Sequence, residues 1–219
     1  MPPVVSIVGR SGSGKTTLLE KLVSELTARG YRVATVKHTP HRIDLDPEKD
    51  TARYLEAGSR ASLASAHDKL MLIKPVDEEA SLVDLVRLLG EDYDLILTEG
   101  FKQEGAPKVE VHRREVGAPL GDLKKLMAIV TDEPLEAKTR QFSLTDIKGL
   151  ADFLESGFIR PQEERLVIYV NGSPLSLSTF PRELVTSVLL GMVSSLKGGG
   201  EVKRLDIFLR RRADEPAEK

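Results

Sequence analysis

The residues most able to do chemistry form one short run near the N-terminus, GRSGSGKT over residues 9–16. This run matches the phosphate-binding pattern G-x-x-x-x-G-K-[ST] at every fixed position. In such a loop the glycines let successive backbone N–H groups converge on phosphate oxygens, and the following helix adds the positive end of its dipole. Lys15 supplies a cation for the β- and γ-phosphates, and the hydroxyl of Thr16 can bind Mg²⁺. The residues expected to form this nucleotide site are Gly9, Arg10, Ser11, Gly12, Ser13, Gly14, Lys15 and Thr16.

A magnesium-bound triphosphate also needs a carboxylate, and the run DLILTEG over residues 94–100 offers two. Asp94 precedes the apolar stretch and is expected at the N-terminal edge of a strand, whereas Glu99 follows the stretch. Because ligands of open parallel sheets bind at the carboxyl ends of the strands, Glu99 is favoured as the metal-side group. The alternative, a solvated carboxylate at a strand end, stays open.

A polar loop, KHTPHRIDLD over residues 37–46, follows the second expected strand at the same edge of the sheet. Such a loop can approach the γ-phosphate or the metal, as switch loops do. His38 and His41 lie three residues apart, but no third ligand stands at a useful spacing. A zinc site is therefore disfavoured against a hydrogen-bonding or partner-facing role for these histidines.

The elements that must position these residues follow from the periodicity of apolar residues. Short apolar runs indicate strands at residues 4–8, 32–37, 94–98, 108–111 and 126–131, and residues 62–66 and 70–73 are expected to pair as a hairpin. Helical spacing indicates helices from Lys15 to about residue 30, over residues 47–57, after a cap at Ser81, and from Thr145 or Asp146 to residue 154. This alternation favours an α/β fold of the P-loop NTPase type, with a mainly parallel sheet and helices on both faces.

Composition divides the chain into a nucleotide-binding domain over residues 1–160, a small α+β unit over 165–210 and a charged tail over 211–219. In the small unit, Asn171-Gly172 between two apolar runs is a strong hairpin signal. Pro181 fits the first turn of a helix, and residues 202–209 alternate as a last strand would, giving a ββαβ unit. A unit of about 45 residues is marginal alone, so it is expected to pack on the main domain or on another chain.

Composition also excludes several functions. The chain has 219 residues and a formal charge of −2, which disfavours general binding to nucleic acid or to anionic membranes. It has no cysteine, so disulfides, thiolate nucleophiles and cysteine-ligated metal centres are excluded. No apolar run approaches the roughly 20 residues of a membrane span, and the first run is too short for a signal peptide. A soluble, cytoplasmic protein is expected.

Several further motifs occur in an order that resembles the MobB family, the molybdopterin-guanine dinucleotide biosynthesis adaptor proteins, across about residues 4–158. They are the loop over 9–17, VKHTPH at 36–41, DLD at 44–46, KD at 49–50, EAG at 56–58, DLILTEGFK at 94–102, PKVEV at 107–111 and VTD at 130–132. The K-H-T-x-H loop together with E-G-F-K is the most selective pair. Pro40 stands where many relatives carry a third histidine, and the segment from Leu166 onward lies outside the common core.

The resemblance implies a GTP-binding accessory protein, typically a dimer, that works beside the molybdopterin guanylyltransferase and other molybdenum cofactor enzymes. By position, the segment from Gly12 to Thr17 would hold the phosphates, and Thr16 with Glu99 would hold Mg²⁺. Asp132 would accept from N1 and N2 of guanine, although the usual N-K-x-D string is missing. Intrinsic GTP hydrolysis would be slow or negligible. The cleft for the anionic ligand would be lined by Lys37, His38, Asp44 and Lys102.

Two other functions are open at this point. A small-molecule kinase or ATP-dependent ligase would use Glu99 for Mg²⁺ and Lys37 or Lys102 for an acidic substrate. A kinase usually needs an Arg-rich closing segment, however, and Arg113-Arg114 follows an expected strand rather than filling a lid helix. A nucleic-acid-dependent NTPase is disfavoured by the near-neutral charge and the lack of an aromatic–basic platform.

Overall fold

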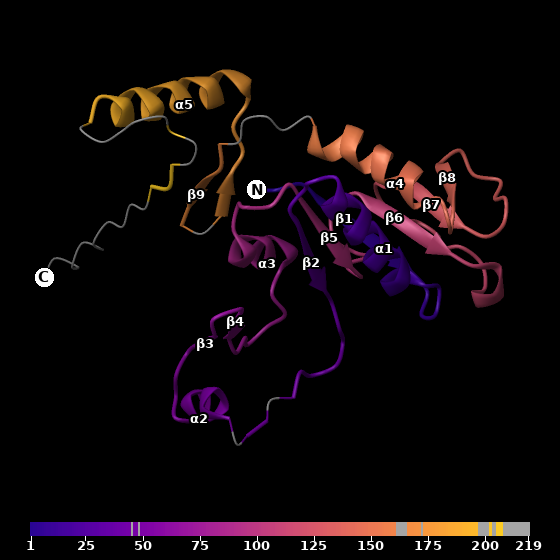
Figure 1. Ribbon diagram of the computed structural model, residues 1–219, viewed down its shortest axis with the longest axis horizontal. Coiled ribbons are helices and arrows are strands. Elements are labelled where there is room, and N and C mark those ends of the chain that lie inside the picture. The colour runs from indigo at the N-terminus through magenta and orange to yellow at the C-terminus, as the bar shows by residue number, and fades with distance from the viewer. Residues whose placement is uncertain are drawn as a thin grey trace, which may run out of the picture. The chain divides into compact units, whose positions relative to one another are not determined.

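Six parallel strands form the central sheet of the computed structural model, which describes residues 1–44, 46–47, 49–160, 166–171, 173–196, 202 and 205–207. The order across the sheet is β2-β5-β1-β6-β7-β8. Strand β1, which leads into the phosphate loop, therefore lies in the middle, between β5 and β6 (Figure 1). The strands are β1 (Val4–Gly9), β2 (Val33–Lys37), β5 (Leu95–Glu99), β6 (Lys108–His112), β7 (Leu126–Thr131) and β8 (Arg140–Ser143).

Helices cover both faces of this sheet, which confirms the predicted fold class. Helices α1 (Lys15–Ala28) and α4 (Ile147–Leu154) pack on one face, where Leu22 and Leu150 share a buried cluster with Val5. Helix α3 (Leu82–Leu89) packs on the other face, where Val86 lies in a second cluster with Ile96. Parallel strands alternate their side chains between the two faces, so both clusters draw on the same sheet.

Side-chain caps in the local sequence explain where helices α3 and α4 begin. The Ser81 hydroxyl accepts a hydrogen bond from the Asp84 N–H at 3.2 Å, and the Asp146 carboxylate accepts one from the Gly149 N–H at 3.0 Å. Each side chain satisfies an N–H group that the first helical turn leaves without a partner. Of the two caps considered for α4, the structure therefore selects Asp146 rather than Thr145.

The long connection from β2 to α3 contains α2 (Asp50–Glu56) and the antiparallel pair β3 (Ser62–Ser65) and β4 (Leu70–Ile73). The predicted hairpin is confirmed, whereas the predicted helix begins at Asp50 rather than at residue 47. A short 3₁₀ turn (Arg114–Val116) follows β6, and a π-helical turn (Glu155–Ile159) follows α4.

Strand β8 is the element of the sheet that the sequence did not predict. It has four residues, of which only Phe142 is buried, so it carries almost no apolar pattern. The connections from β5 to β6, from β6 to β7 and from β7 to β8, all within the described residues, contain no α-helix. The expected alternation of strand and helix therefore holds only in part of the sheet.

The chain divides into two compact units, residues 1–163 and 164–219. In the second unit β9 (Ile168–Val170) pairs antiparallel with β10 (Ser173–Leu175), and α5 (Thr179–Ser194) follows. Of the strand predicted over 202–209, residues 203–204 and 208–209 lie outside the described part, and 202 and 205–207 belong to no strand. Residues 161–164, between the two predicted domains, and the predicted charged tail over 211–219 also lie outside it. Within the described residues, no helix has the length and apolar character to cross a membrane.

A network of charged side chains holds the C-terminal end of α1 against α4. Arg29 donates to Glu25 at 2.8 Å, to Asp152 at 2.6 Å and to Glu155 at 2.8 Å, and Arg160 donates to Glu155 at 2.5 Å. The hydrogen bonds from Arg29 and Arg160 lower the pKa of Glu155 from 4.5 to about 2. The folded state therefore favours the ionised carboxylate more strongly than the unfolded chain does.

Glu155→Gln should consequently destabilise the protein in a pH-dependent way. The depressed pKa contributes stability that is present above about pH 4.5 and is lost as the pH falls through about 2. Urea unfolding between pH 7 and pH 2.5 should show a stability gap between wild type and variant that narrows as the pH falls. Glu20→Gln, on the exposed side of α1, is the matched control and should show no gap. A gap that stays constant with pH would contradict this role of Glu155.

Candidate functional site

The phosphate loop leaves the carboxyl end of β1 and turns directly into α1. Gly9 is required at the turn, because a Cβ there would collide with the carbonyl oxygen of Val111 in β6. Gly14 stands at the N-cap of α1 with a φ of 90°, a conformation that glycine adopts at little cost. The loop therefore presents its backbone at the N-terminus of α1, where N–H groups without intrahelical partners favour an anion.

Lys15 lies folded over this loop, with its Nζ donating to the carbonyl oxygen of Arg10 at 2.8 Å. Burial lowers the pKa of Lys15. The negative charge of Glu99 opposes this shift, whereas the positive charges of Lys102 and Lys37 add to it. Lys37 from β2 and Lys102 from the segment after β5 thus act electrostatically on Lys15 at the loop. Their shared positive charge suits a polyanion.

Glu99 is the acidic residue that the structure brings to the loop. Its Oε2 accepts a hydrogen bond from the Thr16 hydroxyl at 3.0 Å and lies 3.9 Å from the Nζ of Lys37. Asp94, at the opposite end of β5, instead accepts from the backbone N–H of Arg32 at 2.8 Å. The preference for Glu99 over Asp94 agrees with this geometry.

The pair formed by Thr16 and Glu99 is chemically suited to Mg²⁺, which prefers oxygen ligands. Magnesium sites commonly use one or two protein oxygens and leave the other positions to water and phosphate. The hydroxyl and the carboxylate stand beside Lys15, at the loop that would hold the phosphates. The donor set therefore fits a magnesium-bound phosphate chain.

The polar loop over residues 37–46 lies only partly at the site. The backbone N–H of His38 bonds to the carbonyl oxygen of Glu99, but its imidazole bonds to Glu79 at 2.7 Å and lies 5.3 Å from the ring of Phe101. His38 therefore borders the site with its ring engaged elsewhere. Asp44 is exposed on the segment before α2, and within the described part of the chain no hydrogen bond or ion pair ties it to the loop.

A hollow of about 320 Å³ lies at the carboxyl ends of β7 and β8. Asp132 borders it, and its Oδ1 accepts the backbone N–H of Arg114 at 3.0 Å. Neighbouring Glu133 bonds to the imidazole of the buried His112 at 2.9 Å. The hollow lies at the same edge of the sheet as the phosphate loop and is lined by Thr131, Asp132, Glu133, Pro134, Gln141, Phe142 and Ser143.

One residue that the sequence did not assign to the site contacts the phosphate loop directly. Arg113, the first residue after β6, donates through Nε to the carbonyl oxygen of Ser13 at 3.2 Å. The sequence feature that could have indicated Arg113 is its position directly after a predicted strand. That signal becomes useful only once β6 is known to neighbour β1.

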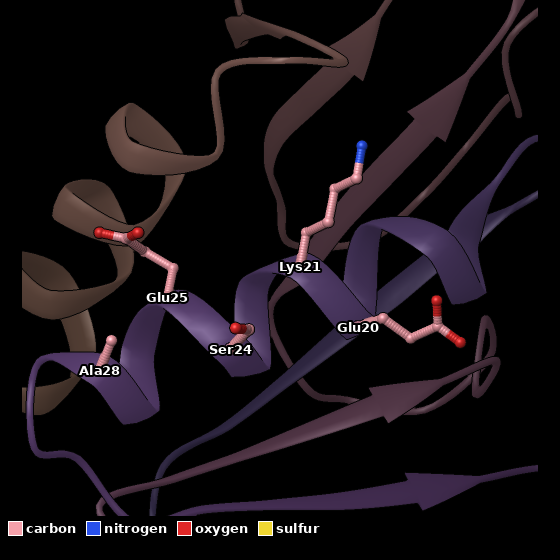
Figure 2. Close-up of a pocket in the computed structure, with 5 residues that line it drawn as sticks. All are labelled: Glu20, Lys21, Ser24, Glu25 and Ala28. Carbon is pink, nitrogen blue, oxygen red and sulfur yellow. The ribbon is translucent and has the colours of Figure 1, made fainter.

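A larger depression, about 380 Å³, lies along the outer side of α1 (Figure 2). Helix α1 alone lines it, through Glu20, Lys21, Ser24, Glu25 and Ala28. In Figure 2 the carboxylate of Glu25 points toward the neighbouring helix, whereas Lys21 and Glu20 point away from it. Because a single helix contributes every lining residue, polar groups do not converge here as they do at the phosphate loop.

A strand, a G-x-x-x-x-G-K-[ST] loop and a helix at the centre of a parallel sheet define the P-loop NTPase-like class of proteins, and this chain has that fold. The family model of MobB, molybdopterin guanine dinucleotide synthesis protein B, matches residues 4–132, more than half of the chain. The chain belongs to the MobB family.

Individual relatives agree with this assignment. The molybdopterin-guanine dinucleotide biosynthesis adapter protein of Haemophilus influenzae is 40% identical over 157 residues, covering 70% of this chain and 88% of its own length. The molybdopterin-guanine dinucleotide biosynthesis adapter protein of Escherichia coli is 37% identical over 161 residues, covering 70% of this chain and 92% of its own length. The crystal structure of a MobB homolog from Bacillus stearothermophilus aligns with a TM-score of 0.57 and 32% identity, covering 73% of this chain and 99% of its own.

Proposed function

We propose that this protein is an adapter in molybdopterin-guanine dinucleotide biosynthesis that binds magnesium GTP and assists the molybdopterin guanylyltransferase. The observation that carries the nucleotide part is the hydrogen bond from Thr16 to Glu99 beside Lys15 at the phosphate loop. The pathway part rests on the relatives from Haemophilus influenzae and Escherichia coli, whose names describe adapters of this biosynthesis rather than kinases or ligases.

In this proposal the loop's backbone N–H groups and the N-terminus of α1 hold the phosphates. Lys15 exchanges its bond with the Arg10 carbonyl for the β- and γ-phosphates, and Lys37 and Lys102 lower the electrostatic cost of bringing a polyanion into the cleft. Thr16 and Glu99 would hold Mg²⁺, which neutralises phosphate charge when it is bound. No residue is assigned as a general base, and we propose that GTP hydrolysis is slow or negligible.

We propose that guanine binds in the hollow at the ends of β7 and β8 and that Asp132 reads its N1 and N2 hydrogens. The position of the hollow supports this, since bases follow phosphates along the carboxyl edge of such sheets. The bond from the Arg114 N–H orients the Asp132 carboxylate and already uses one of its two oxygens.

We further propose that the protein is a homodimer. The hairpin β3–β4 supports this, because it forms a separate two-stranded sheet that exposes half or more of Leu63, Leu70 and Met71. A lone two-stranded sheet is marginally stable in water and has unpaired strand edges. Covering it with a second copy would bury both the apolar side chains and the edges.

Calorimetric titration with GTP and with ATP, each with Mg²⁺ and in EDTA, tests the proposed ligand. We expect GTP to bind at least about tenfold more tightly than ATP, since an adenine cannot donate two hydrogen bonds to Asp132. The same protein should retain a molybdopterin guanylyltransferase on an affinity column. Equal binding of the two nucleotides, or no binding of either, would contradict the proposal.

A further inference from the structure

The segment that follows β6 is tied to the phosphate loop at both of its ends. At one end Arg113 donates through Nε to the carbonyl oxygen of Ser13 at 3.2 Å. At the other end the Nε of Arg10, in the loop itself, donates to the carbonyl oxygen of Ala118 at 2.7 Å. Between them, the backbone N–H of Arg114 reaches Asp132 at the end of β7. The segment thus joins the phosphate loop to the hollow at β7.

The Arg113 guanidinium lies directly against the loop at Gly14. A Cβ at Gly14 would stand 3.4 Å from both Nε and Nη2 of Arg113, so the guanidinium lies within van der Waals contact of the loop at this position. The side chain is 35% exposed and belongs to neither hydrophobic cluster. Its guanidinium contacts the loop through Nε and lies 3.6 Å, through Nη1, from Oε1 of Glu115.

The bond to Ser13 has a consequence for the neighbouring N–H group. The Ser13 carbonyl and the Gly14 N–H belong to one planar trans peptide and point in opposite directions. Arg113 fixes the carbonyl on one side, so the Gly14 N–H must point to the other side. In a loop of this pattern that side is where backbone N–H groups converge on the phosphates.

We propose that Arg113 is a positioning residue of the nucleotide site, which acts through the Ser13–Gly14 peptide to aim the Gly14 N–H at a phosphate of a nucleoside di- or triphosphate. This inference rests on the proposed function, because it assumes that the loop binds such a ligand. The positive charge of Arg113 contributes less to nucleotide binding in this proposal. The hydrogen bond from Nε to the Ser13 carbonyl carries the effect.

Three variants of the full-length protein separate the hydrogen bond from the charge. Arg113→Gln removes the charge but keeps an N–H donor, since the glutamine Nε2 stands at the same place along the side chain as the arginine Nε. Arg113→Met keeps the length without a donor. Arg53→Met is the matched control, because Arg53 is an arginine on α2, 69% exposed, whose side chain pairs only loosely with Asp50 of the same helix at 3.5 Å.

Affinities for Mg-GTP and Mg-GDP are measured by calorimetry, and melting temperatures without ligand check that each variant is folded. We expect Arg113→Met to weaken both nucleotides by about tenfold, the loss typical of one hydrogen bond to a charged group. Arg113→Gln should stay within about threefold of wild type, and Arg53→Met within about twofold. A residue that only stabilised the fold would lower the melting temperature without lowering the affinity of the folded protein.

Three results would overturn the inference: full affinity in Arg113→Met, equal losses in the Met and Gln variants of Arg113, or an equal loss in Arg53→Met. If Arg113→Met does not fold, the Arg113→Gln variant decides alone. A tenfold loss of its nucleotide affinity overturns the inference, and an affinity near that of wild type supports it. Wild-type protein that binds neither nucleotide would instead refute the proposed function itself.

Discussion

Replacing Lys15 with alanine should reduce the affinity for Mg-GTP by at least about a hundredfold and leave the protein folded. The ammonium would make charge-assisted hydrogen bonds to two phosphate groups, each of which is roughly twice as strong as a neutral bond. In the structure its Nζ donates to the Arg10 carbonyl of its own loop and the side chain is partly exposed, so its removal creates no cavity in the core. Calorimetry gives the affinity, and circular dichroism with a melting curve gives the folded state.

Lys21→Ala is the matched control for this experiment. Lys21 is on the same helix, carries the same charge and is exposed on the outer side of α1, away from the loop (Figure 2). Its loss should change nucleotide affinity by no more than about twofold, because exposed charges are screened by salt. A folded Lys15→Ala protein with wild-type affinity would refute the assignment of the phosphate loop.

Glu99→Gln should weaken nucleotide binding about 10- to 100-fold when Mg²⁺ is present, the range seen when a supporting partner of a metal site is lost. The substitution keeps the shape of the side chain and its contact with Thr16 but removes the negative charge. In EDTA the loss should vanish, since a carboxylate near the phosphates only repels them when no metal stands between. Titrations with GTP under both conditions measure the difference.

Asp94→Asn serves as the control at the other end of β5. It removes one carboxylate charge from the same strand, at the edge away from the phosphate loop, where Asp94 bonds to Arg32. It should leave the magnesium dependence of binding unchanged. An equal loss in EDTA for Glu99→Gln would show that Glu99 does not act through the metal.

Local spacing in the sequence was enough to predict the unit that carries the candidate site. The strand over residues 4–8, the loop over 9–16 and the helix from Lys15 all form as predicted, because each depends on residues within a few positions of one another. Caps at Ser81 and Asp146 have the same local origin. The preference for Glu99 over Asp94 also came from the sequence, since the direction of a parallel strand decides which of its ends faces the ligand.

Strand order was decided only by the tertiary structure. β6 lies beside β1 although about a hundred residues separate them, and this pairing brings Arg113 to Ser13. Strand β8 exists because β7 offers it an edge, as its own four residues bury only Phe142. Neither result follows from local periodicity, because strand pairing depends on residues far apart in the chain.

Lys108 shows the same limit in a single side chain. The sequence places a lysine at the start of the strand predicted over residues 108–111, yet it is fully buried. Its Nζ donates to the carbonyl oxygens of Glu104, Ala106 and Lys124, and burial lowers its pKa. A buried ammonium is tolerated only where such acceptors surround it. The sequence therefore determined which residues could bind phosphate. Long-range strand pairing determined which other charged side chains lie beside those residues and which are buried, because only the folded chain fixes the distances between remote residues.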